Sequence, residues 1–544
     1  LRGGQRHVYG TGERFDGPDQ QGRGSSGQVA EHFTRQGPWS YLPVPLFLTD
    51  GGFGWFRDAG ENVRFAFEEG GVVRIESAAG PRIADHLLTG APAAQLRAYL
   101  ALTGECMLPP EWAFGLWISA NGWHCDADVD EQLSLLKEHD CPASVMVLEA
   151  WSDESTFYRW NAIWPDPAGT VRRIRDQGLH LILWQIPVLK ALHDCPDAEP
   201  VRQDWEEAIA KGYVVRREDG SPYVVPDKWF AGSLLPDFTN PEAYRWFKDE
   251  VIKKYTLDIG IDGWMADFGE YLPTDDLVLS NGVSPMIEHN HWPALWAKCN
   301  YDAVKESGKL GQVVYFMRAG GTGSQKYCTL LWAGDQSVDF SRHDGLCTVI
   351  CAALSSGMVG CGLNHCDIGG YTSLFDNCRT KEVFLRWAEM AAFMPVMRTH
   401  EGNRPDTNFQ YYDDEDCMTQ LARLVDIYTM LAPYTKTLVA ENAAKGTPVM
   451  RPLFLHYEDD PRSYTEQFEY LYGSDLLVAP VWHSGATEWE VYLPGDAWVH
   501  LWTGKVYGKG THTVPAEMGD IPVFCRKGSQ WTELFDSIRE KYGK

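Results

Sequence analysis

The sequence predicts an α/β protein built on a (β/α)8 TIM barrel, flanked by an N-terminal β-sandwich domain and a C-terminal β-sandwich domain. Eight short runs rich in β-branched and aromatic residues alternate with amphipathic helical stretches between about residues 113 and 400. Eight such units indicate a closed parallel barrel, because a doubly wound sheet rarely needs so many. The 544 residues also exceed the size at which one hydrophobic core stops growing, so we expect more than one domain.

The first region, residues 1–112, is expected to form the N-terminal β-sandwich. Alternating segments such as Val44–Leu48 and Val72–Glu76 are separated by Gly-rich turns, which is typical of antiparallel strands.

The barrel is expected over residues 113–445. Its strands are predicted at Ala113–Ser119, Ala143–Ala150, Leu179–Ile186, Gly263–Asp267, Val313–Arg318, Leu330–Ala333, Val359–Asn364 and Pro395–His400. Helices between them are predicted at Asp128–His139, Thr170–Gln177, Pro241–Tyr255 and Trp292–Ser307. An insertion at about residues 192–240 follows the third strand, and loops of that length inside a compact domain are usually functional.

The last region, residues 446–544, is expected to form the C-terminal β-sandwich and a terminal helix. Short strands are predicted between Gly, Asp and Pro turns, and the helix at the end of the chain. The segments are Pro448–His456, Leu476–Val481, Glu490–Tyr492 and Trp498–Trp502 for the strands and Ser529–Tyr542 for the helix.

The composition narrows the choice of partners. A formal net charge of −27 repels nucleic acid and anionic membrane surfaces, although the same charge also serves solubility. No run of about twenty apolar residues could span a bilayer. The 13 cysteines show no disulfide-framework spacing, which is typical of free thiols in a reducing compartment. We therefore expect a cytoplasmic protein with a small ligand; homo-oligomerisation stays open.

Polar side chains follow the predicted strands at the end of the barrel where active sites form. Carboxylates dominate this set, and two carboxylates facing a substrate can act as nucleophile and proton donor at a glycosidic bond. The polar residues are Asn121, Glu149 with Asp153, Gln185, Asp267 with Glu270, Arg318, Asp335, Asp367 and His400. The interleaved aromatic residues, suited to stacking on sugar rings, are Trp151, Trp264, Phe268, Trp332 and Tyr371.

Some of these residues could have roles other than glycoside hydrolysis. Asp267 could only cap the next helix, Asp335 could be a turn residue, and Glu270 is a rival nucleophile on chemical grounds. The run His365-Cys366-Asp367 suggests a metal site. Adjacent side chains on an extended segment cannot converge on one ion, however, so we expect neither a metal nor a cofactor.

Several ordered blocks resemble glycoside hydrolase family 31. The most specific is Trp264-Met265-Ala266-Asp267-Phe268-Gly269-Glu270-Tyr271-Leu272-Pro273, which is similar to the nucleophile region of that family. Further matching blocks are Tyr9–Glu13, Leu102–Gly104, Leu108–Pro110, Phe316–Gly320, Trp332–Gln336, Asp367–Tyr371 and Met397–Asn403.

The resemblance implies a retaining α-glycoside hydrolase that removes terminal sugars. It implies that Asp267 is the nucleophile, that Asp335 is the acid/base, and that Arg318 and His400 bind the sugar in subsite −1. From the chemistry of the strand ends, we add Glu149, Asp153, Trp264, Trp332 and Tyr371 as candidate substrate-binding residues.

The sugar itself is predicted less directly. From about Leu234 onward the chain resembles the sulfoquinovosidase branch, in which a residue matching Tyr371 helps to hold a sulfonate. The N-terminal half, with Phe114–Trp123 and Val147–Asn161, resembles α-glucosidases and α-xylosidases instead. Sulfoquinovosidases place an Arg and a Trp, three residues apart, in the loop after the second strand, and this chain does not match them. Its N-terminal domain and its loop at Asn161 are also shorter than in the family.

These features favour a neutral α-glucoside over a sulfoquinovoside. The loop after the second strand carries Asp153 and Glu154 beside Glu149, and these carboxylates would repel a sulfonate that only Arg159 could offset. Transglycosylation is a further alternative, because it uses the same two acids and differs only in the acceptor of the second step.

Overall fold

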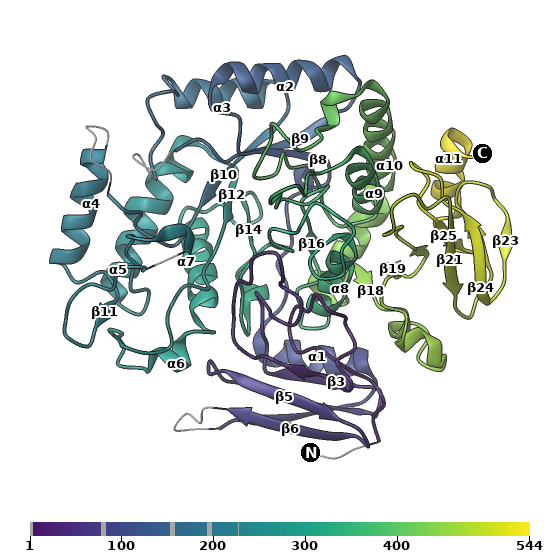
Figure 1. Cartoon of the computed structure of the whole chain (residues 1–544), viewed down its shortest axis with the longest axis horizontal. Coiled ribbons are helices and arrows are strands. Elements are labelled where there is room, and N and C mark those ends of the chain that lie inside the picture. The colour runs from purple at the N-terminus through teal and green to yellow at the C-terminus, as the bar shows by residue number, and fades with distance from the viewer. Residues whose placement is uncertain (1–3, 78–82, 153–157, 193–197, 227) are drawn as a thin grey trace.

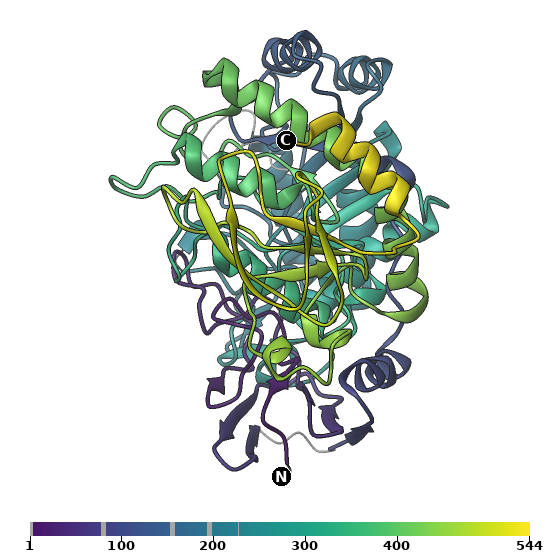
Figure 2. The same cartoon turned by 90° about the vertical axis from the view of Figure 1, so that its right-hand side faces the viewer.

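The computed structural model describes residues 4–77, 83–152, 158–192, 198–226 and 228–544. Figure 1 shows a central barrel with one β region below it and another at its side, where the chain ends. In the view of Figure 2 the C-terminal sheets lie in front of the barrel and the N-terminal sheets lie beneath it. Within the described residues no helix is both long enough and apolar enough to cross a membrane.

The central sheet has eight parallel strands in the order β16-β15-β14-β12-β10-β9-β8-β17. Their bounds are Leu116–Ala120 (β8), Ala143–Leu148 (β9), His180–Gln185 (β10), Gly263–Ala266 (β12), Val314–Met317 (β14), Leu330–Trp332 (β15), Asn364–His365 (β16) and Met397–Arg398 (β17). The first and last strands in this order meet through a parallel bridge between Ile368 and Thr399, where the Ile368 N–H donates to the Arg398 carbonyl at 3.0 Å. This confirms the predicted barrel.

The seventh strand of the barrel differs from the prediction. The run Val359–Asn364 was expected to be the seventh strand, but the strand is β16, only Asn364–His365. Helix α8 extends to Gly357, and the chain then turns through Gly360, whose φ of +89° suits a residue without a Cβ atom. The apolar residues of the run therefore pack in a turn.

Helices cover the outside of the barrel. Several begin at side chains that cap free backbone N–H groups: Asp166 accepts from Gly169 N at the start of α3, and Asp414 from Cys417 N at the start of α10. The helices are Asp126–Glu138 (α2), Pro167–Asp176 (α3), Glu199–Ala210 (α4), Pro241–Trp246 (α5) with a π-helical continuation Phe247–Lys253, Pro285–Glu288 (α6), Trp292–Glu306 (α7), Leu346–Gly357 (α8), Lys381–Ala391 (α9) and Glu415–Lys445 (α10).

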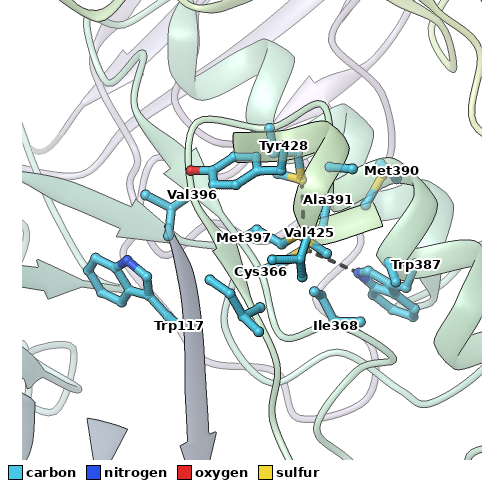
Figure 3. Packing of buried hydrophobic residues seen from close by; sticks show 14 of the residues in the cluster. Trp117, Cys366, Ile368, Trp387, Met390, Ala391, Val396, Met397, Val425 and Tyr428 are labelled. Carbon is cyan, nitrogen blue, oxygen red and sulfur yellow. Dashed lines mark hydrogen bonds between the residues drawn. The ribbon is translucent and has the colours of Figure 1, made fainter. Parts of the chain in front are cut away.

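The insertion after β10 contains α4 and a short strand, β11 (Arg216–Arg217), which pairs with β13 (Leu277–Val278). On the opposite side of the barrel, α9 and α10 pack against the last strand. Figure 3 shows Cys366 in this apolar layer near Trp387 of α9 and Met397 of β17. The Trp387 indole N–H donates to the Cys366 sulfur at 3.2 Å.

The N-terminal region holds two antiparallel sheets. Their aromatic faces meet in a common core, where Phe47 and Phe65, from different sheets, lie edge to face at 5.9 Å. A helix that was not predicted, α1 (Pro92–Thr103), buries Leu96, Tyr99 and Leu100 at helical spacing. The strands are Val8–Tyr9 (β1), Leu46–Thr49 (β3), Phe53–Arg57 (β4) and Asp85–Thr89 (β7) in one sheet, and Gly24–Ser25 (β2), Val63–Glu68 (β5) and Val72–Ser77 (β6) in the other.

The C-terminal region follows α10. It has a six-stranded sheet, a two-stranded pair and helix α11 (Thr532–Tyr542). The sheet order is β18 (Met450–Arg451), β19 (Tyr470–Tyr472), β20 (Leu476–Val478), β25 (Val523–Arg526), β22 (Trp498–His500) and β23 (Val506–Tyr507), and the pair is β21 (Glu488–Leu493) with β24 (Gly510–Pro515).

Candidate active site

A cavity of about 480 Å³ opens at the carboxyl ends of the barrel strands. Parallel strands end at one rim, so residues that directly follow different strands are brought together there. Six residues that were predicted to be catalytic or to bind substrate line this cavity: Glu149, Asp267, Trp332, Asp335, Tyr371 and His400. Three further strand-end residues noted in the sequence also line it: Asn121, Phe268 and Asp367.

Asp267 directly follows β12. Its Oδ2 accepts a hydrogen bond from the Trp184 indole N–H at 3.0 Å, and its Oδ1 accepts from the Phe268 backbone N–H at 2.7 Å. Phe268 has a φ of +57°, a strained conformation for a residue with a Cβ atom. Burial raises the pKa of Asp267, and the neighbouring Arg318 opposes that rise. The strained turn and these two hydrogen bonds fix the orientation of the carboxylate, which lines the cavity.

Asp335 follows β15 after a single turn at Gly334. A Cβ atom at Gly334 would lie 2.7 Å from the Tyr41 ring of the N-terminal region, so only glycine allows this approach. Burial raises the pKa of Asp335 well above its usual value; Arg318 opposes the rise, while the charge of Asp267 adds to it. A carboxyl group of raised pKa beside a second carboxylate is suited to carrying a proton.

Arg318 links the two aspartates from behind. Its Nη1 donates to Asp335 Oδ2 at 2.9 Å, its Nη2 donates to Glu270 Oε1 at 2.6 Å, and its Nε lies 3.6 Å from Asp267 Oδ1. The side chain is fully buried and does not line the cavity. In this structure its two Nη groups donate to protein carboxylates, and a contact of Arg318 with the sugar stays a prediction.

Glu149 and His400 form a pair on the cavity wall. His400 Nδ1 accepts from the Gly402 backbone N–H at 2.9 Å, so its Nε2 carries the proton that it donates to Glu149 Oε1 at 2.7 Å. Burial alone would raise the pKa of Glu149, but His400, Arg398 and a hydrogen bond from Ser119 together lower it. Glu149 is thus an ionised carboxylate whose negative charge already interacts with His400 and Arg398.

The aromatic candidates separate into two groups. Trp332 and Tyr371 line the cavity, and the Tyr371 hydroxyl accepts from the Asn121 amide at 3.0 Å. Trp264 does not line it, which corrects the prediction. Successive strand residues point to opposite faces, so Met265 faces the cavity while Trp264 points outward, stacks on Tyr315 and donates to Asn300 Oδ1 at 2.8 Å.

Two charged residues that were expected near the sugar are not seen in the cavity. Asp153, with Glu154, lies outside the described residues. Arg159 does not line the cavity; its Nη1 lies 2.7 Å from Asp204 Oδ2 of α4.

Lys190, which was not predicted, lines the cavity, with its ammonium nitrogen 5.6 Å from the centre of the Trp184 ring. Its position in the loop five residues after β10 is the signal that could have identified it.

Glu31 of the N-terminal region, which was not among the predicted site residues, has its Oε1 3.3 Å from Arg318 Nη2. No sequence pattern links it to a site 287 residues further along the chain.

The side chains of His365, Cys366 and Asp367 diverge. His365 Nδ1 lies 3.0 Å from the Leu331 carbonyl, Cys366 contacts Trp387, and Asp367 forms an ion pair with Arg398. Among the residues that the structure describes, no cluster of His, Cys, Asp and Glu could hold a metal ion. The cavity therefore offers carboxylates, two histidines, a lysine and aromatic walls for binding and acid–base chemistry.

Comparisons with known proteins place these features in a family. The model of the glycosyl hydrolases family 31 TIM-barrel domain matches residues 106–438, and the family's C-terminal domain matches residues 446–529. The chain is 40% identical to a sulfoquinovosidase of Escherichia coli, over 98% of this chain and 81% of that protein. It is 50% identical to a sulfoquinovosidase of Agrobacterium fabrum, over 70% of this chain and 57% of that protein.

A solved structure agrees in fold. A family 31 sulfoquinovosidase from E. rectale in complex with an aza-sugar inhibitor superposes with a TM-score of 0.90 at 47% identity, covering 99% of this chain and 83% of that chain. The resemblance noted in the sequence is confirmed: the chain belongs to glycoside hydrolase family 31 and is a glycosidase.

Proposed function

We propose that the protein is a retaining sulfoquinovosidase, which releases sulfoquinovose from the end of α-sulfoquinovosides. The observation that carries the sugar assignment is the 40–50% identity to two sulfoquinovosidases. This identity favours a sulfoquinovoside over the neutral α-glucoside that was predicted from the acidic loop after the second strand.

The proposed reaction is a double displacement. Asp267 attacks the anomeric carbon while Asp335 donates its proton to the departing glycosidic oxygen, which leaves a covalent glycosyl-Asp267 intermediate. Asp335 then removes a proton from water as the water attacks the same carbon. The pair supports these roles because both carboxylates face one cavity and contact one guanidinium, while burial raises the pKa of Asp335 well above its usual value.

Among the residues that the structure describes, the charges of the cavity are more favourable to a sulfonate than the sequence suggested. Glu149 accepts a hydrogen bond from His400 and lies beside Arg398, so its charge is partly balanced. Lys190 brings a positive charge to the same cavity, a role that the sequence analysis gave to Arg159. We infer that Lys190 and the Tyr371 hydroxyl contribute to binding the sulfonate.

One comparison tests this proposal. The kcat/KM values for the 4-nitrophenyl α-glycosides of sulfoquinovose, glucose and xylose should show a preference for sulfoquinovose of at least about a hundredfold, since the loss of a charge-assisted contact costs about that much. A preference for glucose would contradict the sugar assignment and restore the α-glucosidase alternative. Nuclear magnetic resonance of the first product should show the α-anomer, and sugar-transfer products at high donor concentration would instead support a transglycosylase.

A further inference from the structure

The catalytic end of the barrel receives an acidic side chain from the N-terminal region. Glu31 Oε1 accepts from Arg318 Nη2 at 3.3 Å, and its Oε2 accepts from the Tyr271 hydroxyl at 3.0 Å. The Glu31 side chain is 4% exposed and does not line the cavity. It therefore contacts the protein groups behind the two aspartates and not the space where a sugar would bind.

The segment that carries Glu31 is fixed to the barrel on both sides. Before it, the Val29 backbone N–H donates to Asn290 Oδ1 at 2.9 Å and the Val29 carbonyl lies 2.9 Å from His289 Nε2. After it, the Tyr41 carbonyl accepts from the Gly320 N–H at 2.9 Å, and the Tyr41 ring lies 4.9 Å from the Arg318 guanidinium. The position of Glu31 is thus set by the barrel, not by the N-terminal sheets alone.

We propose that Glu31 is a positioning residue of the catalytic centre, which holds Arg318 in the orientation that orders Asp267 and Asp335. A guanidinium has five N–H donors in a rigid plane, so fixing Nη2 between Glu31 and Glu270 fixes the direction of Nη1 and Nε as well. Nη1 then donates to Asp335, and Nε faces Asp267. The proposal rests on the roles assigned above to these two aspartates.

Glu31 also adds a negative charge behind the proposed acid/base. The charge of Glu31 acts with burial to raise the pKa of Asp335 and that of Glu270, the latter to about 7. Removing the charge should lower the pKa of Asp335, so the enzyme would lose its proton donor at a lower pH. The charged and titratable groups that face Asp335 are Arg318, Asp267, Glu31, Asp367, Tyr41, Asp344 and Tyr371.

Two substitutions separate the two effects. Glu31→Ala removes the contact and the charge, and kcat should fall roughly ten- to a hundredfold with little change in KM, as expected for misplaced catalytic groups. Glu31→Gln keeps an oxygen for Arg318 but no charge, so most of kcat should be retained. In both variants the basic limb of the pH profile of kcat/KM should move to lower pH.

The control variant is Asp85→Asn, because Asp85 pairs with Arg57 within the N-terminal region and does not contact the barrel centre. It should lower the melting temperature and leave kcat and the pH profile unchanged. The proposal is overturned if Asp85→Asn loses as much activity as Glu31→Ala, or if the basic limb stays in place in both Glu31 variants.

A crystal structure of Glu31→Ala gives a test that does not depend on the sugar. Arg318 should turn away from Asp335; an unmoved guanidinium would overturn the proposal. A wild-type protein that cleaves no α-glycoside would contradict the proposed function alone, since this structural result would still decide the role of Glu31. If Glu31→Ala does not fold, the pH profile and structure of Glu31→Gln decide it.

Discussion

The two sides of the cavity are built differently. On the strand side, Asp267 directly follows β12, Asp335 follows β15 after two intervening residues, and both share Arg318, which is fully buried. On the loop side, Trp229 lies in the short 3-10 helix Lys228–Phe230 of the insertion and Ile163 lies in a turn after β9. Their side chains are 58% and 53% exposed. Under the proposed mechanism, we expect every substrate to use the groups on the strand side and only some substrates to contact those on the loop side.

This difference separates chemistry from recognition. Buried and mutually bonded charges are already oriented before a substrate arrives, so they can stabilise a transition state without rearrangement. Exposed loop residues are free to vary among related proteins without disturbing that arrangement. Substitutions on the strand side should therefore affect all substrates, and substitutions on the loop side should change preferences among them.

The largest effect is expected for Asp267→Asn. An amide cannot form the glycosyl ester, so kcat should fall at least about a thousandfold for every glycoside tested. Steady-state rates on activated and natural-type aglycones would measure this, with the melting temperature as a control for folding. A variant that keeps more than a few per cent of the wild-type rate would assign the nucleophile elsewhere, with Glu270 as the first alternative.

The next largest effect is expected for Asp335→Asn, and it should depend on the leaving group. Loss of a general acid should slow glycosides of aliphatic alcohols about a hundred- to ten-thousandfold. A 4-nitrophenyl glycoside should lose much less in the first step, because nitrophenolate departs without a proton. Equal losses for both kinds of substrate would indicate that Asp335 has a structural role.

The strand side was also the part that the sequence predicted best. Residues within a few positions of the strand ends, such as Asp267, Asp335 and His400, must meet at one rim once eight parallel strands close. The same reasoning placed Trp264 wrongly because it ignored the alternation of side chains within the strand, which sends Met265 inward and Trp264 outward.

The positions of the other residues in and around the site could not be predicted from the sequence. Glu31 reaches the site only because the N-terminal region docks on the barrel, and no local pattern encodes that docking. Lys190 and Arg159 are both basic residues in loops, and only their packing shows that one lines the cavity and the other pairs with Asp204. Helix α1 did carry a readable signal, with Pro92 at its start and apolar residues at helical spacing.

A smaller and more selective effect is expected for Lys190→Ala. Removing a charge-assisted contact of about 1.5–3 kcal/mol should lower kcat/KM for a sulfoquinovoside roughly ten- to a hundredfold. The value for the corresponding glucoside should change little, because a neutral hydroxymethyl group gains less from an ammonium. Arg159→Ala is the matched control and should leave the ratio of the two values unchanged, since Arg159 does not line the cavity. The reverse outcome, with Arg159 controlling the ratio, would contradict the assignment of the sulfonate to Lys190.

The smallest effect is expected for Trp229→Ala at the mouth of the cavity. The Trp229 ring lies edge to face with Phe33 at 5.5 Å and remains largely exposed, so it can contact the aglycone without being part of the core. Loss of one aromatic contact of about 1 kcal/mol should lower kcat/KM about fivefold for glycosides with large apolar aglycones. Hydrolysis of the glycosyl-enzyme should be unaffected, because the aglycone has already departed at that step. Phe375→Ala is the matched control, since Phe375 is 89% exposed and does not line the cavity. Pre-steady-state rates of aglycone release and of turnover would separate the two steps; a slower second step in Trp229→Ala would place Trp229 against the sugar instead, and the loop side would then take part in the chemistry as well as in recognition.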